Sequence, residues 1–223
     1  MPTYQDLAYG TGVAAGRERT RAVFGQVMGL VALTVGCTAL GAYVGRNLNY
    51  RTGFFLYLLA FACLFGLQFA ARAGREQLAI GLLFGLGLLL GIATAPVINY
   101  YAQTQPAALW QAAGTTALFC GALGAYGYST RRDLSRYYRL FFWALIALLV
   151  FGIVGLLVAI PHGHVIYCVA GLAIFGGFTV LDFNRLKGAN LASAPLLAAS
   201  IFLDIFNVFL LLLSLFGGGG SRR

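Results

Sequence analysis

Charged side chains are scarce in this sequence, and acidic ones are rarer still. Only 9% of its 223 residues are Asp, Glu, Lys or Arg, and just 6 residues are Asp or Glu. Soluble domains usually carry about 25% charged residues, so this composition excludes an ordinary soluble domain and favours lipid as the solvent. Hydrophobic residues make up 60% of the chain, and no segment between the apolar runs is long enough to bury its own core. The sequence therefore predicts an all-α integral membrane protein with almost nothing else attached.

Signals of catalysis, metal binding and nucleic-acid binding are also missing. No serine–histidine or metal-ligand constellation is visible, and the region around Asp204 lacks the glycine-flanked motif of an aspartyl membrane protease. The 4 cysteines fall inside apolar runs without metal-like spacing, as small buried hydrophobes do. The net charge of +9 comes from small basic groups between apolar runs, which is typical of topology signals. We therefore expect no enzyme activity, no cofactor and no nucleic-acid partner.

Seven apolar runs have the length of about 17 to 25 residues that a helix needs to cross a bilayer. Backbone groups in lipid must be satisfied within their own segment, and the alternation of a membrane barrel is absent, so each run should be a helix. The sixth run is short, with room to continue past Asp182 toward Arg185. We expect a cytoplasmic tail at residues 1–22, a transmembrane domain at 23–216 and a flexible tail at 217–223. The predicted spans are 23–43, 54–71, 78–100, 109–128, 140–160, 165–181 and 194–216.

Glycines in the third run form two pairs of small residues spaced four positions apart, Gly81 with Gly85 and Gly87 with Gly91. Such pairs allow two helices to approach closely, so we interpret them as packing positions.

The basic residues predict the orientation of the chain. Most of the 15 Lys and Arg residues fall on one side if the N-terminus is cytoplasmic, and cytoplasmic loops carry the excess of positive charge. With seven spans, the C-terminus would then lie outside. Residues 1–20 are polar and show no signal peptide. Short loops and the lack of targeting signals favour a bacterial inner membrane.

A stripe of polar residues marks one face of the last run. Ser200, Asp204, Asn207 and Ser214 recur at helical spacing among Leu, Ile, Phe, Val and Ala. Asp204 would lie about 9 residues into the span, roughly 14 Å deep at 1.5 Å per residue. A carboxylate there costs several kcal/mol unless it is paired, protonated or wetted, so it is a functional hypothesis by default. Asp182, which closes the preceding run, is its nearest candidate partner.

Four segments resemble the transmembrane Bax inhibitor motif family, in its short bacterial-type form. They are 128–135 (YSTRRDLS), 181–187 (LDFNRLK), 203–209 (LDIFNVF) and 213–217 (LSLFG). The resemblance implies a seven-helix fold with the last helix at its centre. It also implies that Asp182 and Asp204 form a pH-sensing pair in a calcium leak. Family members with a charged latch on the aspartate pair carry an acid or an arginine in the second helix. The second run of this chain is uncharged and contains Gln68, so Arg72 at the end of that run is the possible latch.

The chemistry of two neighbouring carboxyl groups fits this role. Both cannot ionise without strong repulsion, so the pair can hold one proton as a bridge between two helices. Carboxylate oxygens also suit Ca²⁺, although two are too few for a tight site, which favours weak, transient binding and passage. Structural alternatives are that Asp182 is solvated or paired with Arg185, and that Asp204 is permanently protonated and bonded to Ser200 or Asn207.

The leading functional hypothesis is a pH-sensitive calcium leak channel whose partners are the bilayer, Ca²⁺ and H⁺. The same acids would serve a Ca²⁺/H⁺ antiporter. A third hypothesis is a non-transporting regulator that binds membrane proteases or cell-death factors, for which the aspartates would be dispensable. Two other features are assigned to loops. Asp133 is expected to form a loop ion pair, and His162 and His164 are better explained by a turn than by a weak metal or pH role.

Overall fold

The computed structural model of the chain describes residues 4–48, 50–158 and 160–218, and within these ranges every regular element is a helix. The seven long helices are α1 (Tyr4–Val44), α2 (Tyr50–Arg72), α3 (Glu76–Thr104), α4 (Pro106–Ser129), α5 (Tyr138–Leu157), α6 (Gly163–Leu186) and α7 (Ala194–Gly218). Three short 3₁₀ turns, η1 (Gly45–Asn47), η2 (Ser135–Tyr137) and η3 (Leu191–Ser193), join them. The predicted all-α class is confirmed.

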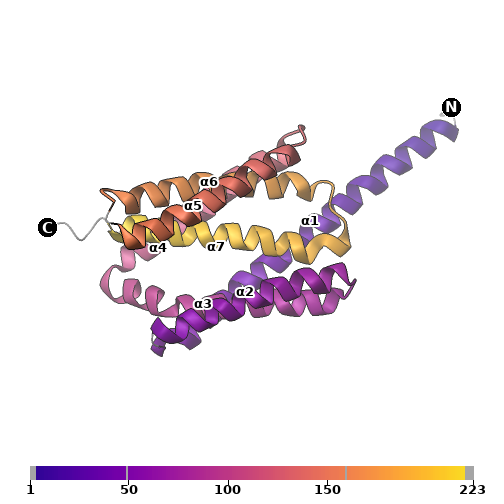
Figure 1. The fold of residues 1–223 in the computed structure, drawn as a ribbon. Helices are drawn as coiled ribbons and strands as arrows, with labels where there is room; N and C mark the ends of the chain where they lie inside the picture. Colours follow the sequence, from indigo (N-terminus) through magenta and orange to yellow (C-terminus); the bar gives the residue numbers. More distant parts are fainter. Residues whose placement is uncertain (1–3, 49, 159, 219–223) are drawn as a thin grey trace.

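Helix α7 lies at the centre of the bundle, as the family resemblance implied. It runs between a group formed by α1, α2 and α3 and a group formed by α4, α5 and α6 (Figure 1). It contacts α1, α2, α3, α4 and α6, and its buried residues extend from Ala194 to Gly217. The face that carries Asp204 is therefore enclosed by protein, which removes it from lipid.

Six helical segments in the described part of the chain are long and apolar enough to cross a membrane. They are Thr20–Asn47, Gly53–Arg72, Glu76–Thr104, Ser135–Leu157, Gly163–Leu186 and Leu191–Gly218. The remaining helix, α4, has 24 residues and thus the length to cross, but many of them are Ala, Gly and Thr, which lowers its hydropathy. Those small residues let α4 pack against α6 and α7.

Three of the differences between the helix ends and the predicted spans concern the tails and the acidic pair. The region predicted as a tail is helical from Tyr4, and α1 projects from the bundle as one continuous helix (Figure 1). Helix α6 continues past Asp182 to Leu186, which places Asp182 inside the helix. Helix α7 continues through Gly217 and Gly218, while residues 219–223 of the predicted flexible tail lie outside the described residues.

The two glycine pairs of α3 have different environments. A Cβ on Gly91 would lie 2.1 Å from the Thr38 backbone oxygen, and one on Gly87 would lie 2.7 Å from the Thr34 side chain. Both glycines therefore permit a close crossing of α3 and α1. A Cβ on Gly81 would meet nothing within 4 Å. A Cβ on Gly85 would lie at the ordinary contact distance of 3.8 Å from Cys63 Sγ of α2, so only the second predicted pair forms a close crossing.

Substituting Gly91→Ala should destabilise the bundle, because the new methyl group would overlap backbone of α1. Overpacking of this kind costs about 1–3 kcal/mol in the free energy of unfolding. Gly81→Ala is the matched control on the same helix and should be neutral or slightly stabilising, since alanine is the better helix former. Thermal unfolding of both variants in the same detergent measures the difference. Equal stabilities would show that the α1–α3 crossing tolerates a methyl group.

Candidate functional site: a buried acidic pair on α6 and α7

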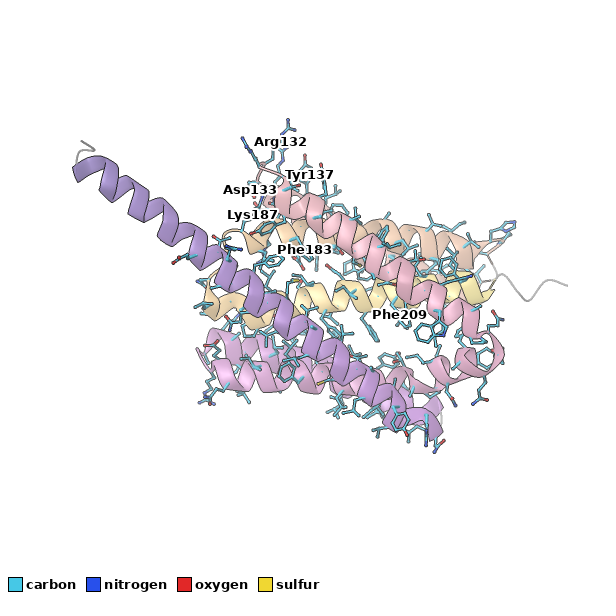
Figure 2. The ribbon with its side chains drawn as sticks, turned by 180° about the vertical axis from the view of Figure 1, so that it is seen from behind. Arg132, Asp133, Tyr137, Phe183, Lys187 and Phe209 are labelled. Carbon is cyan, nitrogen blue, oxygen red and sulfur yellow. The ribbon has the colours of Figure 1, made fainter. Side chains whose placement is uncertain are left out.

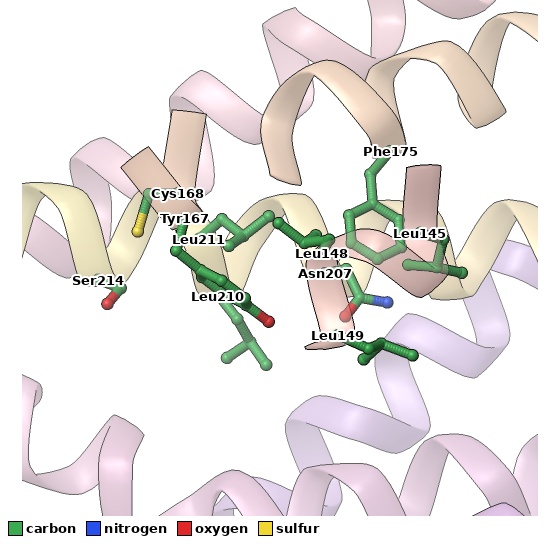
Figure 3. Close-up of a pocket in the computed structure, with 10 residues that line it drawn as sticks. All are labelled: Leu145, Leu148, Leu149, Tyr167, Cys168, Phe175, Asn207, Leu210, Leu211 and Ser214. Atoms are coloured by element: carbon green, nitrogen blue, oxygen red, sulfur yellow. The ribbon is translucent and has the colours of Figure 1, made fainter. Parts of the chain in front are cut away.

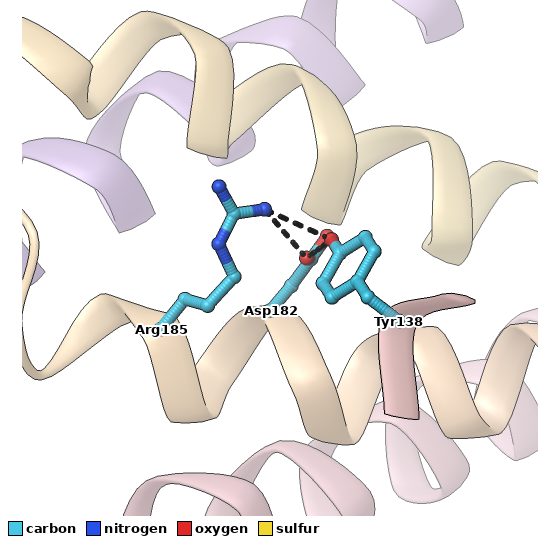
Figure 4. A network of polar contacts seen from close by, with 3 residues as sticks. All are labelled: Tyr138, Asp182 and Arg185. Atoms are coloured by element: carbon cyan, nitrogen blue, oxygen red, sulfur yellow. Dashed lines mark hydrogen bonds and ion pairs between the residues drawn. The ribbon is translucent and has the colours of Figure 1, made fainter. Parts of the chain in front are cut away.

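Asp182 is completely buried near the cytoplasmic end predicted for α6, with 0% of its surface exposed. Its Oδ1 accepts a hydrogen bond from the Tyr138 hydroxyl at the start of α5. The same oxygen lies 3.9 Å from Arg185 Nη1, one turn along α6. Figure 4 shows the three side chains converging between α5 and α6. Of the two structural alternatives for Asp182, solvation is wrong and pairing with Arg185 is confirmed.

Arg185 connects this buried carboxylate to the surface. Its Nη1 donates to the Tyr138 hydroxyl oxygen at 3.1 Å, and its guanidinium carbon lies 5.0 Å from the Tyr138 ring centroid. The Arg185 side chain is 55% exposed. The positive charge therefore sits at the edge of the bundle, where solvent screens it, and neutralises Asp182 only in part.

Asp204 lies across the interface on α7, with 5% of its surface exposed. Its carboxyl group is close enough to that of Asp182 for the two to interact electrostatically. Ser200, one turn earlier on α7, lies beside the Asp182 carboxyl. Oδ2 of Asp182 and Oδ2 of Asp204 are the buried side-chain oxygens that have no hydrogen-bond partner among the described residues. Burying two acids that each have an oxygen without a hydrogen-bond partner costs free energy of folding. This interface is therefore a candidate functional site.

The rest of the predicted polar stripe continues along α7 toward the opposite end of the bundle. Asn207 Nδ2 donates to the Leu203 carbonyl at 2.7 Å, so its amide satisfies its own helix and does not bond Asp204 through that donor. The Ser214 hydroxyl lies 2.7 Å from His164 Nε2 in the first turn of α6. Asn207 and Ser214 both face the α5–α6 side of α7.

A cavity of about 290 Å³ separates α5, α6 and α7 along this stripe. Figure 3 shows Cys168 and Ser214 near one end of it and Asn207 near the other. The walls are mostly leucine, with Tyr167 and Phe175 from α6. The cavity thus begins one helical turn beyond Asp204 and follows the polar face.

Residues that follow Asp182 hold the loop between α4 and α5. Asn184 Nδ2 donates to the carbonyls of Gly127, Thr130 and Arg132 at 3.1–3.3 Å, and its Oδ1 accepts from the Leu134 amide at 3.2 Å. Lys187 also donates to the Thr130 carbonyl. Figure 2 shows Arg132, Asp133, Tyr137 and Lys187 gathered at this end of the bundle, with Phe209 far from them. Segments 128–135 and 181–187 are therefore in direct contact with each other.

Asp133, in that loop, does not form the expected ion pair among the described residues. Its carboxylate accepts hydrogen bonds from the backbone N–H of Ser135 at 2.9 Å and from the Ser135 hydroxyl at 3.0 Å. The backbone bond, then the hydroxyl bond, and to a smaller degree the charge of Arg136 hold the pKa of Asp133 below its usual range. The exposed acid stays ionised and closes a local turn.

The predicted latch does not involve Arg72 in this structure. Arg72 is exposed at the end of α2, and the arginine that contacts the acidic pair is Arg185. Sequence reasoning also missed Tyr138, whose partner lies 44 positions away, and Asn184. The signal available for Asn184 in the sequence was its position, two residues after Asp182 at the end of an apolar run.

The acidic pair does not make a tight cation site by itself. Among the described residues, no group of three or more His, Cys, Asp or Glu side chains is placed to hold a metal ion. Ca²⁺ prefers six to eight oxygen ligands, so two carboxyl groups suit a transient contact with a partly hydrated ion.

Fold and site together define a polytopic α-helical membrane protein with an acidic pair buried between its last two helices. A family model described as "Inhibitor of apoptosis-promoting Bax1" matches residues 20–221. The chain therefore belongs to the Bax inhibitor family, as the four sequence segments indicated.

Relatives of similar length occur in several bacteria. An uncharacterized protein of Chlamydia muridarum is 28% identical over 90% of this chain and 91% of its own length. An uncharacterized protein of Helicobacter pylori is 30% identical over 76% of this chain and 72% of its own length. The inner membrane protein YbhL of Escherichia coli is 29% identical over 86% of this chain and 89% of its own length.

Tyr138→Phe should destabilise the protein, because it removes the hydroxyl that donates to a fully buried carboxylate. Losing a hydrogen bond to a buried charged group costs about 1–3 kcal/mol. Tyr137→Phe, at the exposed neighbouring position, is the control and should change stability by no more than about 0.5 kcal/mol. Unfolding in detergent compares the two. The cost of Tyr138→Phe should shrink in an Asp182→Asn background, since the two side chains interact directly; an undiminished cost would mean that the hydroxyl acts elsewhere.

Proposed function

We propose that this protein is a pH-sensitive calcium leak channel gated by Asp182 and Asp204, and that it acts by transport rather than by catalysis. The observation that carries the proposal is the pair of buried carboxyl groups on adjacent helices, each with an oxygen that has no hydrogen-bond partner among the described residues. A structural acid would normally have its hydrogen bonds completed by the fold. Open oxygens at the centre of a membrane bundle suit groups that exchange protons and cations.

The protonation state of Asp204 would set the strength of the α6–α7 contact. With a proton, Asp204 is neutral and can donate to the open Oδ2 of Asp182 across the interface. Without it, two negative charges face each other in a medium of low dielectric constant, and repulsion acts between the two helices. Arg185 offsets only part of this repulsion because its charge lies at the solvent edge. Raising the pH should therefore favour a more open arrangement.

Polar groups on both sides of the aspartate pair could form parts of a path for a cation. On one side, the stripe of Asn207 and Ser214 and the cavity beside it extend from Asp204 along α7. On the other side, Asp182 is linked through Tyr138 and Arg185 to the exposed surface. Between them, the pair would act as a barrier that a cation passes only when the carboxyl groups are ionised.

We further propose that the protein resides in a bacterial inner membrane with its N-terminus in the cytoplasm and its C-terminus outside. The name of the E. coli relative, inner membrane protein YbhL, supports the membrane. The basic segments support the orientation, because Arg132 and Lys187 lie together at one end of the bundle (Figure 2).

Calcium entry into dye-loaded liposomes at pH 6 and pH 8 tests the channel directly. We expect faster Ca²⁺ entry at pH 8 for the wild type, and loss of this pH dependence in Asp204→Asn, whose amide cannot ionise. Asp133→Asn is the matched control, since it makes the same chemical change in an exposed loop, and should behave like the wild type.

Three outcomes would contradict the proposal. Flux that requires an opposing proton gradient, and not merely a given pH, would indicate Ca²⁺/H⁺ antiport. Absence of flux in wild-type liposomes, or identical pH dependence in wild type and Asp204→Asn, would make the carboxyl groups structural and favour a regulator of other membrane proteins.

Removing the positive charge beside Asp182 should shift the pH at which flux rises. In Arg185→Gln, the state in which both carboxyl groups are ionised loses its cationic neighbour. That state is therefore less favourable than in the wild type. The midpoint should move to higher pH, by an amount that the solvent exposure of the guanidinium reduces. Arg139→Gln, an exposed arginine beside Tyr138, is the control. A midpoint that is equal in both variants would exclude Arg185 from the gate.

A further inference from the structure

We propose a binding site for a soft d¹⁰ metal ion such as Zn²⁺ at the opposite end of α6 from Asp182, formed by His164 and Cys168. Both residues lie on one face of the helix because they are four positions apart. His164 Nε2 lies 3.8 Å from Cys168 Sγ and 2.7 Å from Ser214 Oγ of α7. An imidazole nitrogen and a thiol sulfur are the ligands that Zn²⁺ prefers.

The separation of the two ligand atoms fits one metal ion. With Zn–N about 2.0 Å, Zn–S about 2.3 Å and tetrahedral angles, the nitrogen and the sulfur of one site would lie about 3.5 Å apart. The 3.8 Å between Nε2 and Sγ exceeds that value by about 0.3 Å, so small side-chain movements suffice.

The surroundings supply further ligands and access. The Ser214 hydroxyl can withdraw from Nε2 and coordinate weakly or hydrogen-bond to a metal-bound water. The cavity between α5, α6 and α7 reaches Cys168 and Ser214 and has room for that water (Figure 3). His164 is exposed, so an ion can reach Nε2 from the surface. Three protein groups and a water would complete a four-coordinate site.

The C-terminal end of α7 lies beside the imidazole and favours a cation there. A Cβ built on Gly218 would lie 3.1 Å from His164 Cε1, so the C-terminal end of α7 faces the imidazole. The free carbonyl groups of a helix C-terminus carry partial negative charge. When the metal binds, the Cys168 thiol loses its proton to water and the thiolate sulfur bonds to the metal. Ser214 would then join the ends of α6 and α7 through the bound ion.

Calorimetric titration of Zn²⁺ into tag-free, full-length protein in detergent tests the site. We expect one site in the wild type, and affinity at least about tenfold weaker in Cys168→Ser and in His164→Gln, because even outer-shell losses cost that much. Cys63→Ser is the matched control. That thiol donates to the Leu82 carbonyl at 3.1 Å and should not contribute. Absence of Zn²⁺ binding by the wild type, or an affinity equal to that of the wild type in Cys168→Ser or His164→Gln, would overturn the proposal.

Two further readouts separate loss of a ligand from loss of the fold. Titration with Cd²⁺ should produce thiolate-to-metal charge-transfer absorption in the wild type and in Cys63→Ser but not in Cys168→Ser. Zn²⁺ should raise the Tm of the wild type, because it binds only the folded state, while the metal-free variants keep a similar Tm. A charge-transfer band that persists in Cys168→Ser would place the metal on another cysteine. These assays measure binding without flux, so their result is independent of the calcium proposal.

Discussion

Burying two carboxyl groups side by side in a membrane bundle is the constraint on which the rest of this structure depends. Lipid offers no hydrogen bonds, so such acids persist only where neighbouring protein surrounds them. Helix α7 meets this requirement by lying at the centre, in contact with five other helices. The close crossing of α3 and α1 at Gly87 and Gly91, and the small residues of α4, let those helices enclose it.

The pair is asymmetric, and the asymmetry follows from the positions of the two acids along the bundle. Asp182 lies one turn from the end of α6, where the side chains of Tyr138 and Arg185 can reach it from the surface. Asp204 lies deep in α7 among apolar side chains, near Cys120 of α4. Asp182 is thus held by the Tyr138 hydroxyl and by a partly screened cation, Arg185, whereas the electrostatic neighbour of Asp204 is Asp182 itself.

Segment 181–187 combines two roles within two helical turns. Asp182 faces the interior, while Asn184 and Lys187 bind the carbonyl groups of the loop after α4. Because the α4–α5 loop also positions Tyr138, the geometry of the acidic pair depends on a loop that is itself fixed by the end of α6. Movement of α6 would disturb both contacts together, which couples the pair to this end of the bundle.

Apolar run lengths, the scarcity of charge and the helical spacing around Asp204 determined the class of protein, the approximate spans and the candidate acids from sequence alone. These features are local, and the physics of a bilayer leaves helices as the main way to satisfy them. Tertiary structure alone decided which groups meet. Tyr138 reaches Asp182 across 44 positions, and Ser214 reaches His164 across 50. Such partners are set by the packing of helices and loops, and no spacing in the sequence encodes a contact between helices that are distant along the chain.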